Sequence, residues 1–175
     1  MGWSGVGPSR SRTRGRTGRR IGSRTVGAYR AAAMIGTMAK RIEPSAFVVG
    51  TGQNTDMERA IAVSASVAGS TGLYSSIVTT APGGKTRIHH HGPCETSIYI
   101  SSGLAHYTWG PTGLEHEMDA AAGDFVYIPA GEIHVEENAS ADEPLVVVLT
   151  RNCPDSHVVY MDGGPDGSDD VPAPC

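Results

Sequence analysis

The sequence predicts an all-β protein, a small sandwich or barrel of short strands, and three observations indicate this. From about residue 46 the chain is a series of short runs typical of strands, and clusters of Gly, Pro and Asp separate the runs. Glycine is abundant, at 23 of 175 residues, which suits a fold with many turns. No strong helical period of useful length is present, although residues 54–63 could begin one helical turn.

The expected strands follow one another along the chain at regular intervals. Turn sequences separate them, among them APGG at 81–84, GPTG at 110–113 and PAGE at 129–132. The strand runs are 46–50, 60–66, 73–80, 85–91, 96–101, 104–110, 114–119, 124–129, 133–138, 144–150 and 157–162. We find no internal repeat.

Charge is distributed very unevenly along the chain. Ten of the 14 basic residues lie at or before Arg41, and the first acidic residue is Glu43, so residues 1–42 carry +10. The remainder, with 4 basic and 18 acidic residues, carries −14. We therefore expect a basic disordered extension at 1–42, a β-barrel domain at 43–163 and an acidic flexible tail at 164–175.

The basic extension has three possible roles. It could be a nucleic-acid-binding arm by electrostatics, or a targeting signal, although Arg30 interrupts its apolar stretch. We favour a dispensable extension, with a start at Met34 or Met38, so a nucleic-acid partner is not expected. No apolar run approaches the ~18 residues that a membrane span needs, and no membrane partner is expected.

The cysteines bear on the compartment. Three cysteines, at 94, 153 and 175, are too few and too odd for a disulfide framework, which makes a reducing, cytoplasmic setting the default. The tripeptide NAS at Asn138 would be a glycosylation site only in an exported protein.

The stretch RIHHHGPCE, residues 87–95, predicts a metal site. Side chains alternate between the two faces of a strand, so His89 and His91 share one face and His90 points to the other. Two histidines at i and i+2 can reach one metal ion, whereas adjacent ones cannot. Glu95 follows at a short distance and His134 lies on a distant strand, and both could complete the site.

These residues resemble the paired signature of the cupin superfamily. The second motif, a glycine followed by P-x-G, His and Asn at set intervals, matches at every fixed position; the first departs once, because seven residues rather than six separate Glu95 from its last glycine. The first motif is Gly83, His89, His91, Glu95 and Gly103, and the second is Gly123, Pro129, Gly131, His134 and Asn138. The resemblance implies a jelly-roll barrel that holds a metal on His89, His91, Glu95 and His134.

Three imidazoles and one carboxylate suit a divalent transition metal and suit Ca²⁺ or Mg²⁺ poorly. We expect Fe(II), with Mn, Ni, Zn, Co or Cu as alternatives. Four protein ligands leave positions open for water, O₂ or a chelating substrate, so a mononuclear metal-dependent (di)oxygenase acting on a small polar molecule is the favoured function. A cupin isomerase, decarboxylase or lyase, and a non-catalytic metal- and ligand-binding cupin, are the alternatives.

Further side chains are candidates by the same alternation. Arg87 lies two residues before His89 and could anchor a substrate carboxylate or phosphate. Ser97 and Tyr99 share the face of Glu95 and are candidate substrate-binding residues. Glu136 alternates with His134 and is a candidate catalytic base. We also expect a homodimer, since small cupins often pair through their outer sheets.

Overall fold

The computed structural model describes residues 38–51 and 55–161. The chain divides into two units, Met1–Ala39 and Lys40–Cys175, and every element described below belongs to the second. The predictions for the acidic tail, and for most of the basic extension, lie outside the described residues. In the described ranges, no helix combines the length and the apolar character needed to cross a membrane.

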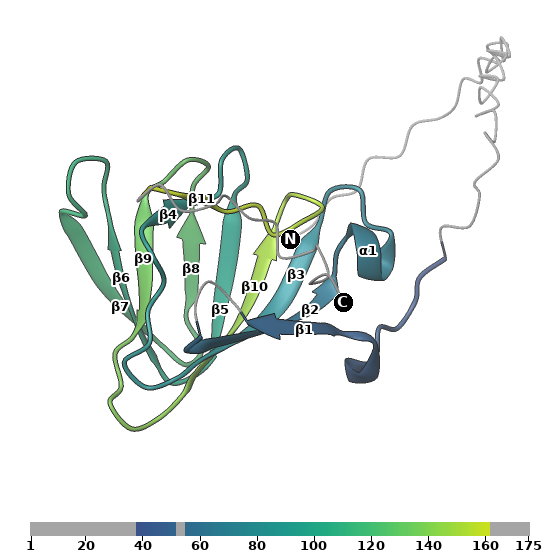
Figure 1. Ribbon diagram of the computed structural model, residues 1–175, viewed down its shortest axis with the longest axis horizontal. Coiled ribbons are helices and arrows are strands. Elements are labelled where there is room, and N and C mark those ends of the chain that lie inside the picture. Colours follow the sequence, from purple (N-terminus) through teal and green to yellow (C-terminus); the bar gives the residue numbers. More distant parts are fainter. Residues whose placement is uncertain (1–37, 52–54, 162–175) are drawn as a thin grey trace, which may run out of the picture. The chain divides into compact units, whose positions relative to one another are not determined.

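Two antiparallel sheets make up the fold, and they contain eleven strands within the described residues (Figure 1). In spatial order the six-stranded sheet is β1 (Val48–Thr51), β2 (Met57–Val63), β3 (Tyr74–Thr80), β10 (Leu145–Arg151), β5 (Thr96–Ser102) and β8 (Phe125–Ile128). The five-stranded sheet is β11 (Val159–Tyr160), β4 (His89–His90), β9 (His134–Asn138), β6 (Leu104–Trp109) and β7 (His116–Ala121).

Helical structure is confined to two short elements in the described ranges, η1 (Pro44–Ala46) and α1 (Ala65–Ala68). The Ser64 side chain accepts a hydrogen bond from the Val67 amide and so caps α1, and Gly69, at φ 68°, ends it. The helical turn considered within residues 54–63 is not formed by its described part, because β2 begins at Met57.

The core lies between the two sheets and is built by alternation. Along β3 and β10, buried residues occupy every second position. The inward side chains of β5 and β10 include Ile98, Ile100, Val147 and Leu149, each at most 5% exposed. Burying one such side chain stabilises the fold by about 1.5–3 kcal/mol. The prediction of an all-β jelly-roll fold is confirmed.

Asn138 at the end of β9 is a structural residue. It is 1% exposed, and its Nδ2 group donates to the carbonyl oxygens of Thr80, Ala81 and Glu143 at 2.9–3.1 Å. Its Oδ1 accepts from the Ser140 amide. The asparagine of the NAS tripeptide therefore ties three backbone segments together inside the protein, and its amide is not presented to solvent.

Candidate metal centre

Three histidine side chains converge inside the barrel. His89 on β4 is paired directly with His134 on β9 across the sheet, and His91 follows just after β4. Their ring centroids are 4.3–5.0 Å apart, and each residue is at most 1% exposed. His90 lies between the first two in sequence, and its Nδ1 instead accepts from the Gly92 amide.

Hydrogen bonds fix which ring nitrogen of each histidine carries the proton. A carbonyl oxygen can only accept, so each Nδ1 that bonds to one must be the N–H donor, and the lone pair is left on Nε2. The acceptors for His89, His91 and His134 are the carbonyl oxygens of Arg87, His157 and Glu132, at 2.8, 3.1 and 2.8 Å. Orientation of this kind, by a hydrogen bond on the far nitrogen, is typical of histidines that bind metals.

A carboxylate joins this group from Glu136, two residues beyond His134 on β9. Ligand atoms of His89, His91, His134 and Glu136 all lie within 4.8 Å of one another. The Oε1 atom of Glu136 is 3.6 Å from Nε2 of His134, and both atoms are buried without a hydrogen-bond partner among the described residues. Buried polar atoms rarely lack a partner. One metal ion bound to both atoms would supply it, and the nitrogen and oxygen ligands suit a divalent transition metal.

Burial controls the charge of the group. It lowers the pKa of His89 to about 3, helped by His134, and lowers the pKa of His91 further, helped by Arg151. Burial alone would raise the pKa of Glu136, but the interaction with His134 outweighs it and brings the pKa to about 2. At neutral pH the first two imidazoles are thus neutral and the carboxylate is ionised, the states that metal ligation requires.

Glu95, expected among the ligands, lies outside this group. It is exposed, and its carboxylate accepts hydrogen bonds from Tyr127 Oη at 2.6 Å and Asn152 Nδ2 at 2.9 Å. The chain turns after His91, where the Cys94 amide donates to the His91 carbonyl oxygen, so strand alternation does not carry through.

The next residue, Thr96, is 1% exposed and faces inward at the start of β5, where its Oγ1 accepts a hydrogen bond from Arg151. The seven-residue spacing to Gly103 was the available signal, since the six intervening residues that the motif requires place Thr96, not Glu95, at that position. Glu136, expected as a catalytic base, is the carboxylate that the structure brings to the histidines.

The expected substrate-binding residues lie elsewhere. Ser97 and Tyr99 alternate with the inward residues of β5 and are exposed, and the Tyr99 ring packs on Phe125 at 4.9 Å. The Arg87 guanidinium lies 4.0 Å above the ring of Tyr160 on β11. None of the three belongs to the four-residue group.

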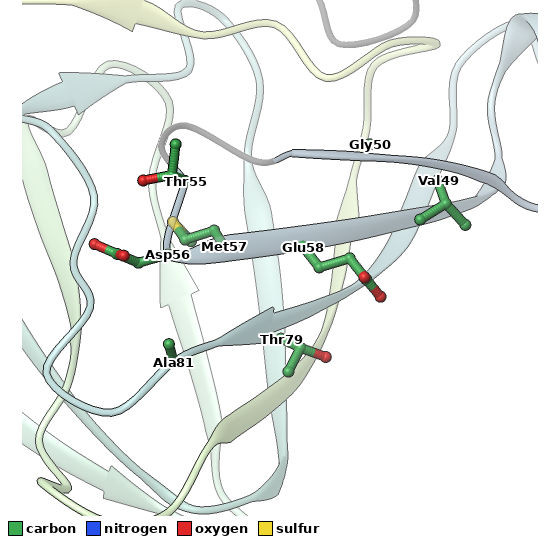
Figure 2. Close-up of a pocket in the computed structure, with 8 residues that line it drawn as sticks. All are labelled: Val49, Gly50, Thr55, Asp56, Met57, Glu58, Thr79 and Ala81. Atoms are coloured by element: carbon green, nitrogen blue, oxygen red, sulfur yellow. The ribbon is translucent and has the colours of Figure 1, made fainter.

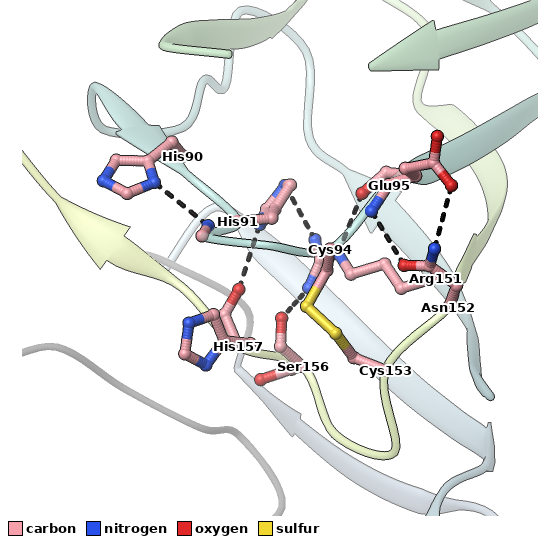
Figure 3. The surroundings of a disulfide bond; sticks show 11 residues. His90, His91, Cys94, Glu95, Arg151, Asn152, Cys153, Ser156 and His157 are labelled. Carbon is pink, nitrogen blue, oxygen red and sulfur yellow. Dashed lines mark hydrogen bonds between the residues drawn. A yellow bond between two sulfur atoms is a disulfide. The ribbon is translucent and has the colours of Figure 1, made fainter. Parts of the chain in front are cut away.

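Arg151, at the end of β10, lies beside His91, and no signal in the sequence indicated this (Figure 3). This residue is 1% exposed, and its Nη2 group donates to His91 Nε2 at 3.0 Å. Its Nε group donates to Thr96 Oγ1 at 3.2 Å, and Nη1 donates to the Ser156 carbonyl oxygen. Burial, followed by the charge of Arg59, lowers its pKa to about 9, so the guanidinium stays positive at neutral pH.

A disulfide bond between Cys94 and Cys153 was also not expected (Figure 3). Their Cα atoms are 5.9 Å apart, and 59 residues separate them in sequence. The bond joins the turn after His91 to the segment after Arg151. That segment also supplies the carbonyl oxygen of His157 that orients the His91 ring.

The two described cavities lie away from the histidines. One, of about 410 Å³, is bounded by β1, β2 and β3, and Asp56, Glu58 and Thr79 are among its lining residues (Figure 2). The other, of about 540 Å³, is lined by residues that include Lys85, Arg87 and Glu137. Neither cavity is lined by a member of the four-residue group.

A buried group of three imidazoles and one carboxylate between two antiparallel sheets defines a metal-binding β-barrel protein. Residues 76–151 match the sequence model of a family described as "Cupin domain". The resemblance to the cupin superfamily is thus confirmed over residues 76–151. No significant match was found among curated proteins.

Similar solved structures are oxalate decarboxylases. A variant of the Bacillus subtilis enzyme is 27% identical, with a TM-score of 0.56 over 62% of this chain and 29% of that one. A study of the Mn(II) centres of the same enzyme gives 26% identity, a TM-score of 0.56 and the same coverage. The formate complex of the Lactobacillus farciminis enzyme, at 20% identity and a TM-score of 0.57, covers 65% of this chain and 34% of that one, and shows the fold alone. The chain thus spans about a third or less of the length of these proteins.

Proposed function

We propose that this protein is a metal-dependent cupin enzyme that decarboxylates a small carboxylic acid, with Mn(II) as its ion. The observation that carries the proposal is the buried group of His89, His91, His134 and Glu136, in a chain that is 26–27% identical to oxalate decarboxylases over this fold. One of those structures is described by its Mn(II) centres, which favours manganese over the iron expected from the sequence.

The proposed ligands would make the site attractive to a carboxylate. Two imidazoles that burial keeps neutral, a third from His134 and one ionised carboxylate leave a bound divalent ion with a net positive charge. The metal would supply Lewis-acid polarisation of a bound carboxylate. The buried Arg151 beside His91 adds a further positive charge on the protein side.

The reaction balances without an external oxidant. In decarboxylation of hydrogen oxalate, the bond between the two carbons breaks, one carbon leaves as CO₂, and the electron pair stays on the other. That carbon takes up the proton and becomes formate, so no net oxidation occurs.

The oxygenase reading is the second candidate, because the same three-histidine, one-carboxylate set leaves positions open for O₂ on an iron ion. A non-catalytic metal-binding role is the third. Similarity to decarboxylases favours the first candidate over both.

Compartment and assembly remain predictions. The cytoplasmic location expected from the sequence is disfavoured by the Cys94–Cys153 bond, because disulfides persist mainly in oxidising compartments. The homodimer expected from the sequence is to be tested by the mass of the purified protein in solution.

The test is to load the metal-free protein with Mn(II) or Fe(II), add oxalate, and measure formate, CO₂ and dissolved O₂. The proposal predicts equal amounts of formate and CO₂ with no net loss of O₂, and no formate from a His134→Ala variant loaded in parallel. Loss of O₂ in proportion to substrate would instead support the oxygenase. Metal binding without any turnover across a panel of small carboxylic acids would support the binding role.

A further inference from the structure

We propose that the metal ion and a small carboxylate bind cooperatively, and that Arg151 is the residue that couples the two. This inference rests on the metal site proposed above and goes further in naming the residue that selects an anionic ligand. The observation behind it is that Arg151 donates a hydrogen bond to the lone pair of His91, a candidate metal ligand.

Arg151 and a metal ion would compete for the Nε2 atom of His91. Because the Nδ1 proton of this ring is donated to the His157 carbonyl oxygen, Nε2 carries the only lone pair of the ring. The Nη2 group of Arg151 donates to that lone pair at 3.0 Å. A metal ion bound by His91 must use the same lone pair, so metal binding requires Arg151 to release this hydrogen bond.

Arg151 is nevertheless held beside the site by its other bonds. Its Nε group is bonded to Thr96 Oγ1, opposite it on β5, and Nη1 is bonded to the carbonyl oxygen of Ser156. The disulfide between Cys94 and Cys153 links the turn before β5 to the segment that carries Ser156 (Figure 3). On metal binding, the guanidinium therefore stays close to His91, with the N–H groups of Nη2 released.

A released, buried guanidinium next to a divalent cation is unfavourable. Among the buried residues in the described part of the chain there is no Asp or Glu, and the half-buried Glu136 is the single carboxylate of the group. Arg59, 2% exposed, adds positive charge close enough to lower the pKa of Arg151, and its effect is opposed by the carboxylates of Glu136 and Asp155. The interior therefore gains excess positive charge when a metal ion binds.

A small carboxylate relieves both problems at once. One of its oxygens can occupy an open position on the metal ion, and the other can accept the N–H groups that Arg151 released, as guanidinium groups do with carboxylates. Its negative charge offsets the charge of the ion and of the arginine. A neutral ligand of the same shape would relieve neither.

Linkage then requires the coupling to act in both directions, so that the anion tightens metal binding and the metal tightens anion binding. Couplings of this kind change an affinity by about 5- to 150-fold. Without the positive charge at position 151, metal binding should be stronger in the absence of an anion and insensitive to its presence.

The experiment titrates Co²⁺ into the full-length, disulfide-intact protein and follows the visible absorption of the bound ion. Titrations are run with no addition, with saturating formate, and with formamide as an uncharged analogue at the same concentration and ionic strength. We expect formate to tighten Co²⁺ binding at least fivefold and formamide to change it less than twofold. An equal effect of formate and formamide, or no effect of formate, would overturn the coupling.

Two variants locate the coupling. In Arg151→Gln, Co²⁺ should bind more tightly than in the wild type without formate, and the formate effect should fall below twofold. Arg87→Gln removes a nearby cation that stacks on Tyr160, and it should keep the full formate effect. Loss of the effect in Arg87→Gln, with retention in Arg151→Gln, would overturn the assignment. If Arg151→Gln does not fold, the wild-type comparison of formate with formamide still decides the coupling.

The two proposals fail in different ways. A protein that binds no Co²⁺ under any condition overturns the metal-dependent function and the coupling together. A protein that binds Co²⁺ and decarboxylates a carboxylic acid, but whose Co²⁺ affinity ignores formate, overturns the coupling alone.

Discussion

Cys153→Ser removes the Cys94–Cys153 bond and should lower the free energy of unfolding. The size of the loss follows from the length of the loop that the bond closes. The bond closes a loop between residues 59 apart in sequence. The chain-entropy relation for such a loop gives about 4 kcal/mol at 25 °C. With a urea dependence of about 2 kcal/mol per molar, typical of a small domain, the unfolding midpoint should fall by about 2 M.

The assay is urea unfolding followed by tryptophan fluorescence, since the partly buried Trp109 packs against the core. Cys175→Ser is the matched control, because it removes the third cysteine and leaves the pair intact; it should keep the wild-type midpoint. Thiol titration of unfolded, unreduced wild-type protein should find one free thiol per chain. Three free thiols, or a midpoint of Cys153→Ser equal to that of Cys175→Ser, would refute the reasoning.

Three further predictions concern stability. The pKa of His89 lies below its ordinary value of 6.5, at about 3, so the unfolded chain binds more protons than the folded one. The free energy of unfolding should therefore fall as pH drops from 6.5 towards 3, by up to roughly 5 kcal/mol. A flat urea midpoint between pH 7 and 4.5 would contradict this. Asn138→Ala should lower the free energy of unfolding in urea by about 2–4 kcal/mol, because three carbonyl oxygens lose a donor. Asn152→Ala, at an exposed site, should cost less. Equal losses would contradict the structural role of the buried Asn138 side chain. Gly92→Ala should be destabilising, since φ is 54° and the added Cβ would lie 2.6 Å from His157 Nε2. Gly113→Ala is the control, because the added Cβ meets open space there. Similar melting temperatures for the two variants would show that His157 does not pack tightly against Gly92.

Most of the strands could be predicted from the sequence because the signals that define them are local. Alternation of side chains and the turn residues between runs placed the strands close to their observed positions, as with β3 at Tyr74–Thr80 for the expected 73–80. Two expected runs give strands of only two residues: 157–162, of which Val159 and Tyr160 form β11, and 85–91, of which His89 and His90 form β4. That strand is short because its partners are the single residue His134 of β9 and the two residues of β11, which no local pattern reveals.

The site was predicted in part, for a similar reason. The inward pair His89 and His91 follows from alternation, and the fixed spacing of the second motif identified His134. Glu95 was expected from its short distance to His91 and from the cupin resemblance, but the backbone turns before it and its carboxylate lies outside the group of histidines. Counting from Gly103 would have placed Thr96 inside.

The buried position of Arg151 and the disulfide could not be predicted from local sequence patterns. A charged residue at the end of the apolar run Leu145–Arg151 is typical of a strand that emerges into solvent. The register of β10 instead sets Arg151 opposite Tyr74 on β3 and Thr96 on β5, which puts its side chain inside the barrel. Cys94 and Cys153 meet through that same strand pairing, and no spacing in the sequence indicates it.

The central claim, that His89, His91, His134 and Glu136 form one metal site, is tested most directly by comparing two isosteric variants in a Mn²⁺ or Co²⁺ binding titration. The wild type should bind one ion per chain. Glu136→Gln should lose at least tenfold in affinity, about 1.4 kcal/mol, and Glu95→Gln, at the exposed carboxylate held by Tyr127 and Asn152, should match the wild type. Wild-type affinity in Glu136→Gln together with a loss in Glu95→Gln would contradict the account.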